Sequence, residues 1–214
     1  FLLFFYSNII GLNPGLAGTA IFIALCVDAF TDPLMGTISD RTNTSFGRRH
    51  PYMFISFIPM SLGYIFLFAP RQDWDMSQSD LFVWMTIFTI LTRIGMTLFD
   101  IPHRAFGGEI TKNYNERTLL MSWREMFAWV AGLSNAFLGY GVFFASKPEF
   151  PQGQLNPDAW FPFALTGALI MIISVLYSSL STKNEINSLS KWSGSIALGA
   201  ILNELKIALG NKSF

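Results

Sequence analysis

The chain is a series of long apolar stretches separated by short polar links, a pattern typical of a protein that crosses a membrane repeatedly. A spanning helix needs about 20 mostly apolar residues. Such stretches predict spans over 15–38, 51–70, 81–103, 126–146 and 159–182, and the apolar residues 1–10 are interpreted as the end of a first span. The sequence therefore predicts an all-α membrane protein with six transmembrane helices.

The last part of the sequence, residues 183–214, is more polar than the spans before it. Between residues 196 and 209, isoleucines and leucines recur at helical spacing, with Asn203, Glu204 and Lys206 on the opposite face. This pattern predicts an amphipathic helix on a membrane surface or against cytoplasmic loop ends. We expect a transmembrane bundle over 1–182, with an incomplete first helix, and the start of a central cytoplasmic linker over 183–214.

Basic residues gather on one side of the predicted bundle, and Lys and Arg in short links mark the cytoplasmic side. The opposite links carry only Arg71 and Lys147, beside several acids. The basic side comprises the link between spans two and three, the link between spans four and five, and the tail: Arg41, Arg48, Arg49, Arg104, Lys112, Arg117, Lys183, Lys191, Lys206 and Lys212. Both ends of the chain should therefore face the cytoplasm.

The composition supports a lipid-facing protein and argues against other classes. Charged residues make up 13% of the chain, whereas soluble domains carry about 25%. The net charge of zero gives no electrostatic basis for binding nucleic acid. The single Cys26 excludes an intramolecular disulfide, and neither His50 nor His103 has a second ligand at metal spacing. Because no catalytic motif is present, we expect no enzyme and no cofactor.

Two acids lie inside the second predicted span. Asp28 and Asp32 are four residues apart and share a helix face, and Thr31 adds a hydroxyl oxygen. An ionisable residue in a bilayer costs about 2.5–3.5 kcal/mol on insertion scales, so such residues usually serve a function. Neighbouring carboxylates repel unless a cation or proton lies between them. The pair indicates a site for Na⁺ or a shared proton; the alternative is structural charges satisfied by neighbouring helices.

The fourth predicted span adds Arg93 and Asp100, seven residues apart and thus on one helix face. Arg93 stays charged and needs a carboxylate partner, for which Asp28, Asp32 and Asp100 are the candidates. The alternative to a functional role is a structural ion pair between helices. Pro102 is expected to close this span, which would place Asp100 beside a local break.

A basic loop follows the second span at once. The glycine at its start permits close helix packing, and its Arg and Asp side chains can pair with helix ends and so latch two states. The alternative is a generic loop of the cytoplasmic side. The candidate residues are Gly36, Asp40, Arg41, Gly47, Arg48 and Arg49.

These residues resemble a known family. The string Asp28-x-x-x-Asp32-Pro-x-x-Gly36-x-x-x-Asp40-Arg41, continued by Phe46-Gly47-Arg48-Arg49-x-Pro51, resembles the glycoside–pentoside–hexuronide:cation symporters of the major facilitator superfamily. The resemblance spans essentially the whole chain. The family's fourth and fifth helices are matched by Thr97, Asp100-Ile101-Pro102, Glu116-Arg117 and Arg124.

The resemblance implies a twelve-helix transporter of two six-helix halves around a central site. This chain would be the N-terminal half, with a C-terminal six-helix half as its partner. The implied activity is symport of a sugar or glycoside with Na⁺ or H⁺ across a bacterial-type cytoplasmic membrane. The implied roles are cation binding by Asp28, Thr31, Asp32 and Thr97, substrate binding by Asp100 and Arg124, and gating by Asp40, Arg41, Arg48 and Arg49.

The sequence also departs from the family pattern. Thr31 stands where a well-known member has an amide, and Met96 and Arg104 stand where it has aromatic residues that pack on the sugar. Arg93 stands where a small neutral residue is expected. A second hypothesis is therefore a carrier of an anionic or lipid-like substrate, with Arg93 binding an anionic head group. A third is a non-transporting membrane sensor or scaffold.

Overall fold

The computed structural model describes residues 1–111 and 113–183, and the regular elements in these ranges are all helices. α1 (Leu2–Phe4) continues into the π-helical η1 (Phe5–Ile10). Three single-turn helices lie in the links: η2 (Gln72–Trp74), η4 (Gly153–Leu155) and η5 (Pro157–Ala159). The main helices are α2 (Pro14–Arg41), α3 (His50–Ile55), α4 (Phe57–Leu67), α5 (Gln78–Ile110), α6 (Tyr114–Leu138) with its extension η3 (Gly139–Phe143), and α7 (Trp160–Ser181).

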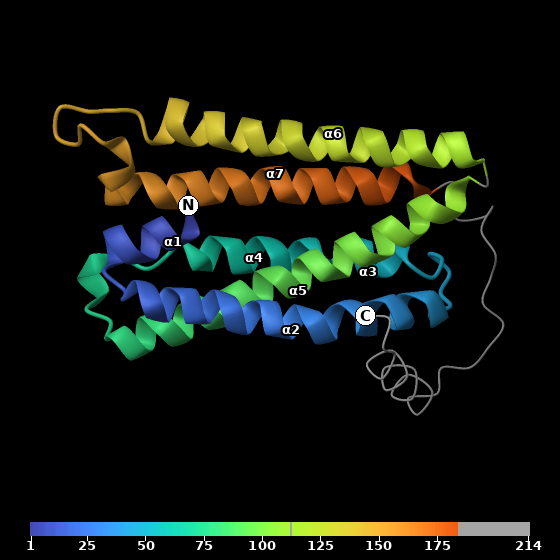
Figure 1. The fold of residues 1–214 in the computed structure, drawn as a ribbon, viewed down its shortest axis with the longest axis horizontal. Coiled ribbons are helices and arrows are strands. Elements are labelled where there is room, and N and C mark those ends of the chain that lie inside the picture. Colours follow the sequence, from blue (N-terminus) through green and yellow to red (C-terminus); the bar gives the residue numbers. More distant parts are fainter. Residues whose placement is uncertain (112, 184–214) are drawn as a thin grey trace.

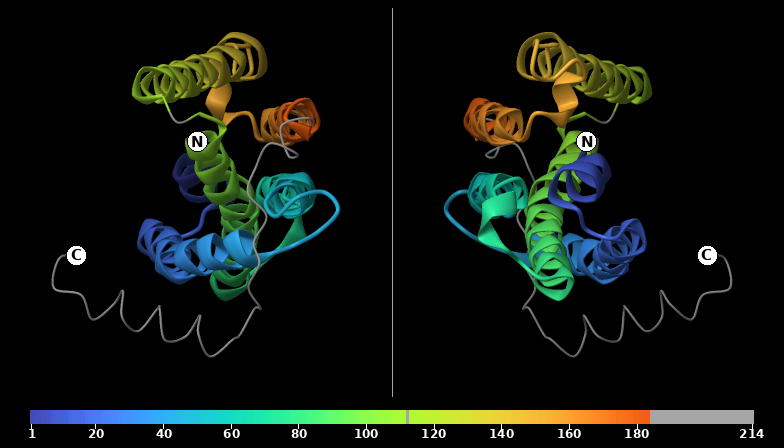
Figure 2. Two further views of the ribbon diagram at one scale, coloured as in Figure 1. Left: turned by 90° about the vertical axis from the view of Figure 1, so that its right-hand side faces the viewer. Right: turned by 90° about the vertical axis from the view of Figure 1, so that its left-hand side faces the viewer.

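The helices run lengthwise beside one another, and α5 crosses obliquely between α2 and α4 (Figures 1 and 2). α7 lies between α4 and α6 in Figure 1. Five segments of the described chain are long and apolar enough to cross a membrane: Pro14–Arg41, His50–Leu67, Gln78–Ile110, Tyr114–Phe143 and Pro157–Ser181. With the short helical segment 2–10 they follow the order of the predicted spans, and the all-α membrane fold is confirmed.

Two predicted boundaries differ from the structure. The expected break at Pro102 is wrong, because α5 continues through this buried proline to Ile110. Proline removes a single backbone donor, and neighbouring packing can hold a membrane helix through it. The uncharged residues 126–146 were expected to make most of the fifth span. Its helix begins further upstream, at Tyr114, because its first turns carry charged residues that an apolar pattern leaves out. The amphipathic helix expected over 196–209 lies outside the described residues.

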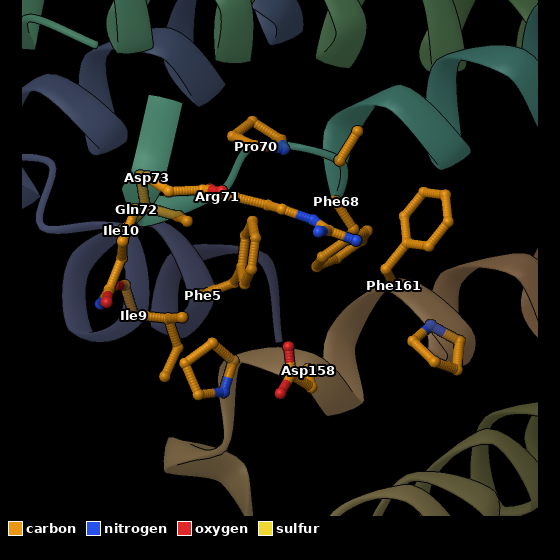
Figure 3. A pocket seen from close by; sticks show the side chains of 13 residues that line it. Phe5, Ile9, Ile10, Phe68, Pro70, Arg71, Gln72, Asp73, Asp158 and Phe161 are labelled. Atoms are coloured by element: carbon orange, nitrogen blue, oxygen red, sulfur yellow. The ribbon is translucent and has the colours of Figure 1, made fainter. Parts of the chain in front are cut away.

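A cavity of about 470 Å³ opens where η1, η2 and η5 meet (Figure 3). Its aromatic lining includes Phe5, Phe68 and Phe161, and Figure 3 shows the Arg71 side chain running toward Phe68. Asp158 lines the cavity as well. Since Arg71 and Asp158 belong to the links that sequence analysis placed on the outer side, the cavity lies at the predicted outer end of the bundle.

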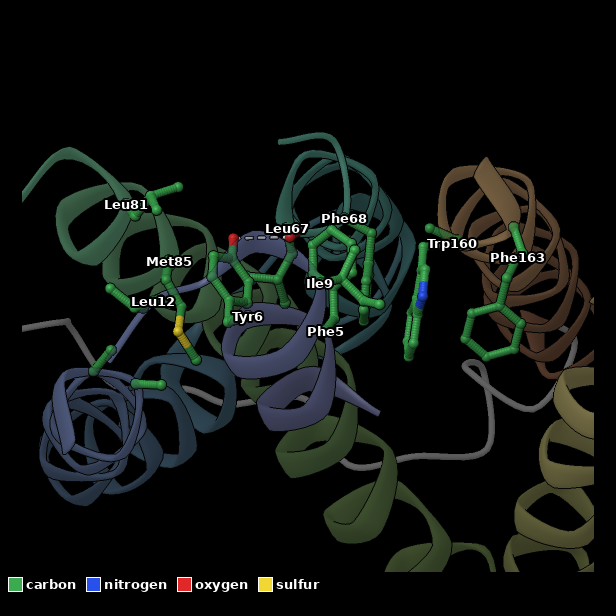
Figure 4. Close-up of a cluster of buried hydrophobic side chains, with 14 of the residues drawn as sticks. Phe5, Tyr6, Ile9, Leu12, Leu67, Phe68, Leu81, Met85, Trp160 and Phe163 are labelled. Atoms are coloured by element: carbon green, nitrogen blue, oxygen red, sulfur yellow. Dashed lines mark hydrogen bonds between the residues drawn. The ribbon is translucent and has the colours of Figure 1, made fainter. Parts of the chain in front are cut away.

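Aromatic side chains form the core near this same end (Figure 4). Trp160 is fully buried, stacks on Phe68 with ring centroids 5.9 Å apart, and donates its indole N–H to the Gln154 carbonyl at 2.9 Å. The Tyr6 hydroxyl donates to the Leu67 carbonyl at 2.8 Å. These contacts join η1, α4 and α7, so burial of its side chains anchors the short first helix. This helix is shorter than the five segments that are long enough to cross a membrane.

Glycines allow α4 and α5 to pack closely. A Cβ added at Gly63 would lie 2.7 Å from the Thr92 nitrogen, and one at Gly95 would lie 2.6 Å from the Met60 Cα. Real Cβ atoms do not approach other atoms so closely, so both positions require glycine. Gly36, the glycine expected to permit close packing, would place a Cβ 3.7 Å from an Ile101 methyl, an ordinary contact. The close approach that requires glycine therefore lies between α4 and α5 and not at Gly36 on α2.

Hydrogen bonds fix the starts of α2 and α5 relative to each other. Gln78 accepts from the Asn13 backbone N–H and donates to the Gly11 carbonyl, both at 2.8 Å. The Asn13 side chain caps α2 by accepting from the Gly15 N–H at 2.8 Å, as an N-cap residue does. From this shared start the two helices stay in contact, and they carry the charged residues of the membrane interior.

Candidate functional site

Charged and polar side chains from α2 and α5 meet around one cavity of about 140 Å³. α5 contributes Arg93, Thr97 and Asp100, with Met96 and Ile101 completing the lining, and α2 contributes Asp28 and Asp32. The helical spacing brings this about, because residues four apart on α2 and residues three or four apart on α5 project from one face. We call these seven residues the α2–α5 site.

An ion pair and a hydrogen bond join the two helices across this site. The Arg93 Nε donates to Oδ2 of Asp28, which sequence analysis named as one of three possible partners. One turn further along each helix, the Thr97 hydroxyl donates to Oδ1 of Asp32 at 2.7 Å. The Asp28 side chain is 15% exposed and that of Arg93 is 35% exposed. The contacts thus hold the two predicted cation-binding acids in different chemical environments.

Asp100 has two arginine partners. Arg104 lies one turn further along α5 and donates its Nε to Oδ2 of Asp100 at 2.6 Å. Arg124 reaches over from α6 and donates to Oδ1 at 3.1 Å. The structure therefore brings Asp100 and Arg124 together, as expected for two residues of one site. Arg104, noted in the sequence only as a departure from the family, is the additional partner.

Two buried oxygen atoms at the site have no hydrogen-bond partner among the described residues. They are Oδ1 of Asp28 and the Thr31 hydroxyl oxygen. A buried polar atom without a partner costs free energy and usually indicates a functional or solvated position. Thr31 itself does not line the 140 Å³ cavity, although it neighbours Asp32 on α2.

A second charged cluster lies at the predicted cytoplasmic end of α2 and α5. Arg49 is 5% exposed and donates its Nε to Oδ1 of Asp40 at 3.1 Å. Its Nη1 also lies 3.0 Å from Oε2 of Glu109, an ion pair that lacks hydrogen-bond alignment. Arg48 pairs with Oε1 of the same Glu109. We call Asp40, Arg48, Arg49 and Glu109 the cytoplasmic cluster.

Sequence analysis found three members of this cluster and missed Glu109. It lies 61 residues from Arg48 and belongs to no repeated motif, so only its place at the end of the fourth span could have indicated it. Gly47 takes a left-handed backbone conformation with φ of 77°, which explains a glycine there. Arg41 ends α2 beside this cluster. Gly36 packs against Ile101 and is separate from the ion pairs.

The fold and these contacts define a class of protein: a multi-pass helical membrane protein with paired charges between helices in its interior. In the described part of the chain, no group of three His, Cys, Asp or Glu side chains is arranged to hold a metal ion. The outer cavity of Figure 3 contains none of the predicted site residues. The charged chemistry of the membrane interior is thus concentrated between α2 and α5, with Arg124 added from α6.

Comparison with known proteins places the chain in a family. All of residues 1–214 match the family described as MFS/sugar transport protein, and the chain belongs to this family of membrane transporters. It is similar to an uncharacterised symporter of Synechocystis, 33% identical over 86% of this chain and 34% of the relative. It also resembles a putative glycoside/cation symporter of Escherichia coli, 28% identical over 100% of this chain and 44% of the relative.

An isoprimeverose transporter of Lactiplantibacillus pentosus is 25% identical over 96% of this chain and 42% of its own length. The resemblance to glycoside–pentoside–hexuronide:cation symporters is thereby confirmed. The chain spans between about a third and under half of the length of these relatives. It is a multi-pass integral protein of the bacterial cytoplasmic membrane, and its helices fit the N-terminal half of the major facilitator fold.

Proposed function

We propose that the protein is a secondary active transporter that carries a sugar or glycoside together with a cation, Na⁺ or H⁺. The observation that carries the proposal is the α2–α5 site, where Asp28, Asp32 and Asp100 line one cavity inside the membrane. Carboxylates at that depth are costly and mark ion or substrate pathways. The relatives named as glycoside/cation symporter and isoprimeverose transporter supply the substrate class.

The site divides into an ion half and a substrate half. The ion half consists of Asp28, Thr31, Asp32 and Thr97, which offer carboxylate and hydroxyl oxygens. The substrate half is centred on Asp100, whose carboxylate accepts hydrogen bonds from sugar hydroxyls while Arg124 holds it in place. Thr97 of the ion half and Asp100 of the substrate half lie on neighbouring turns of α5, so neutralising the ion half favours substrate binding. By linkage, the substrate then raises the affinity for the ion equally.

The cytoplasmic cluster serves as a gate in this proposal. Arg48 and Arg49 lie in the link between α2 and α3, whereas Asp40 ends α2 and Glu109 ends α5. Ion pairs between helix ends hold one arrangement and must break for the cytoplasmic side to open. Arg41 and Gly47 belong to the same link, Arg41 at the end of α2 and Gly47 at a tight turn, and Gly36 lies one turn before Asp40 on α2. In the family this motion is rocking of one helical half against the other.

The pairing of the arginines bears on the choice of substrate. A carrier of anionic molecules would need a guanidinium free to bind them. Arg93 contacts Asp28, and Arg124 and Arg104 both contact Asp100. The positive charges beside the cavity are thus compensated, which favours a neutral sugar over the anionic or lipid-like substrate. The earlier suggestion that Arg93 binds substrate stays a prediction, and its contact with Asp28 places it beside the ion half.

Uptake by the full-length protein in proteoliposomes tests the proposal. A panel of radiolabelled mono- and disaccharides and glycosides is offered with an inward Na⁺ gradient, with an acid-outside pH gradient, or with neither. We expect at least one sugar to accumulate above its external concentration only when one gradient is present. The variant Asp32→Asn should abolish accumulation, because it removes a carboxylate of the ion half.

A matched control is Asp75→Asn, the same chemical change at an exposed residue in the outer link. Asp75 has a φ of 50°, a conformation that asparagine also adopts readily. This variant should transport like the wild type. Gradient-driven accumulation that survives in Asp32→Asn would refute the ion assignment. Binding of sugars without accumulation under any gradient would instead favour a sensor.

A further inference from the structure

We propose that Arg93 is a built-in cation of the ion half, and that it makes the site selective for a proton bound by Asp32 rather than for Na⁺. The inference rests on the proposed symport function and refines it. It starts from the position of the guanidinium, which lies between α2 and α5 and contacts one of the two acids that a coupling ion would share. Arginine stays protonated in proteins, so this positive charge is permanent.

The three carboxylates of the α2–α5 site differ in their partners. Asp28 pairs with Arg93, and Asp100 pairs with both Arg104 and Arg124. Asp32 receives the Thr97 hydroxyl at 2.7 Å, and within the described ranges no basic side chain forms an ion pair with it. Asp32 is therefore the carboxylate whose charge is not compensated by direct contact. An exchangeable cation is stabilised most at this position.

The surroundings of Asp32 favour a proton over a metal cation. A hard cation such as Na⁺ binds several oxygen ligands at once, and its site would have to include Asp28 as well as Asp32. Oδ2 of Asp28 is held by Arg93, so one of the two oxygens of this carboxylate is already occupied. The guanidinium also repels a second cation next to it. The same repulsion acts on a proton, but a proton needs a single lone pair of Asp32 and no second ligand, so the occupied Asp28 does not exclude it.

The charged groups around Asp32 come from three helices. α2 itself carries Asp28, one turn before Asp32. α5, which packs along α2, carries Arg93 and Asp100, and α6 reaches Asp100 through Arg124. Residues 2–10 also pack against α2, and they contain no charged side chain. The charge beside Asp32 thus changes most when Arg93 is altered.

The test measures which ion drives sugar uptake in proteoliposomes of the full-length protein. In the wild type, an acid-outside pH gradient should drive accumulation without Na⁺, and added Na⁺ should change the rate by less than about twofold. In Arg93→Gln, which keeps a side-chain donor but removes the charge, Asp28 and Asp32 become available together. Na⁺ should then stimulate uptake by roughly tenfold, about 1.4 kcal/mol in coupling. The control Arg71→Gln removes a positive charge from the outer link and should leave the ion dependence unchanged.

A second measurement applies whether or not Arg93→Gln folds well. Thermal unfolding of the purified protein in NaCl or in choline chloride reports ion binding directly, and Na⁺ should stabilise Arg93→Gln but not the wild type. If Arg93→Gln cannot be purified, the uptake assay on the wild type is sufficient. Wild-type uptake that requires Na⁺ would overturn the inference about Arg93 but would still support the proposed symport. An active Arg93→Gln without a Na⁺ response also overturns it. Absence of any gradient-driven uptake in the wild type refutes symport itself.

Discussion

Replacing Glu109 by glutamine should weaken the cytoplasmic cluster more than any other single acid-to-amide change in it. Glu109 pairs with both Arg48 and Arg49, whereas Asp40 pairs with Arg49 and is half exposed. Opposite charges about 4 Å apart at an effective dielectric of 20 attract by about 4 kcal/mol. Because Glu109 is 31% exposed and Arg49 keeps Asp40, a net loss of about 2 kcal/mol is expected, within the range for hydrogen bonds to charged groups.

A loss of this size should lower the midpoint of thermal unfolding by about 4–8 °C, scaling from domains of 150–250 residues. The assay is thermal unfolding of the purified protein in detergent, followed by tryptophan fluorescence. The matched control is Glu116→Gln, in which an exposed glutamate accepts a hydrogen bond from the Thr111 hydroxyl. The control should shift by about 1–2 °C, as surface substitutions do. Equal shifts for Glu109→Gln and Glu116→Gln would refute the reasoning.

Three further predictions concern packing and the ion half. Gly95→Ala should destabilise the protein by about 1–3 kcal/mol, because the added Cβ would overlap the Met60 backbone. Thermal unfolding measures this loss. The control is Gly18→Ala, because a Cβ at Gly18 would meet no atom within 4 Å. Trp160→Ala should cost about 3–5 kcal/mol by leaving a cavity in the core of Figure 4, and an unchanged melting temperature would contradict that placement. Thr97→Val should reduce gradient-driven uptake roughly tenfold or more by removing the donor to Asp32, whereas Thr97→Ser should retain it.

The order of the helices could be predicted from the sequence because lipid imposes a length and an apolar composition on every span. The boundaries of α5 and α6 could not, because both helices extend through charged turns that lie outside an apolar stretch. The 33 residues of α5 pass Pro102 and end near Glu109, and α6 starts at Tyr114. A hydropathy pattern reports where lipid surrounds a helix, and hydrogen bonds and ion pairs decide where the helix ends.

The candidate site was predictable where its residues share one helix. The spacing of Asp28 and Asp32 predicted that both lie on one helix face. Because Arg93 needs a carboxylate partner, the sequence also limited its possible partners to three acids. Which acid it contacts depends on how α2 and α5 are offset along their axes, and the sequence does not specify this offset. The same limit explains Glu109, which meets Arg48 only because two separate helices end at the same level.

In the proposed function, the pairing of charges lets one pair of helices carry both the ion half and the gate. Each ionisable group in the membrane interior costs about 2.5–3.5 kcal/mol on insertion scales. Arg93 compensates Asp28, and Arg104 and Arg124 compensate Asp100. On α2, Asp32 and Asp40 are eight residues apart, about 12 Å along the helix at 1.5 Å per residue. On α5, Thr97 and Glu109 are about 18 Å apart by the same measure. Gln78 joins the other ends of the two helices. In the proposed symport cycle, a change in the distance between Asp32 and Thr97 would tilt the helices about this joined end, and the displacement would be largest at the cytoplasmic cluster. Neutralisation of Asp32 would then act on Arg49 and Glu109.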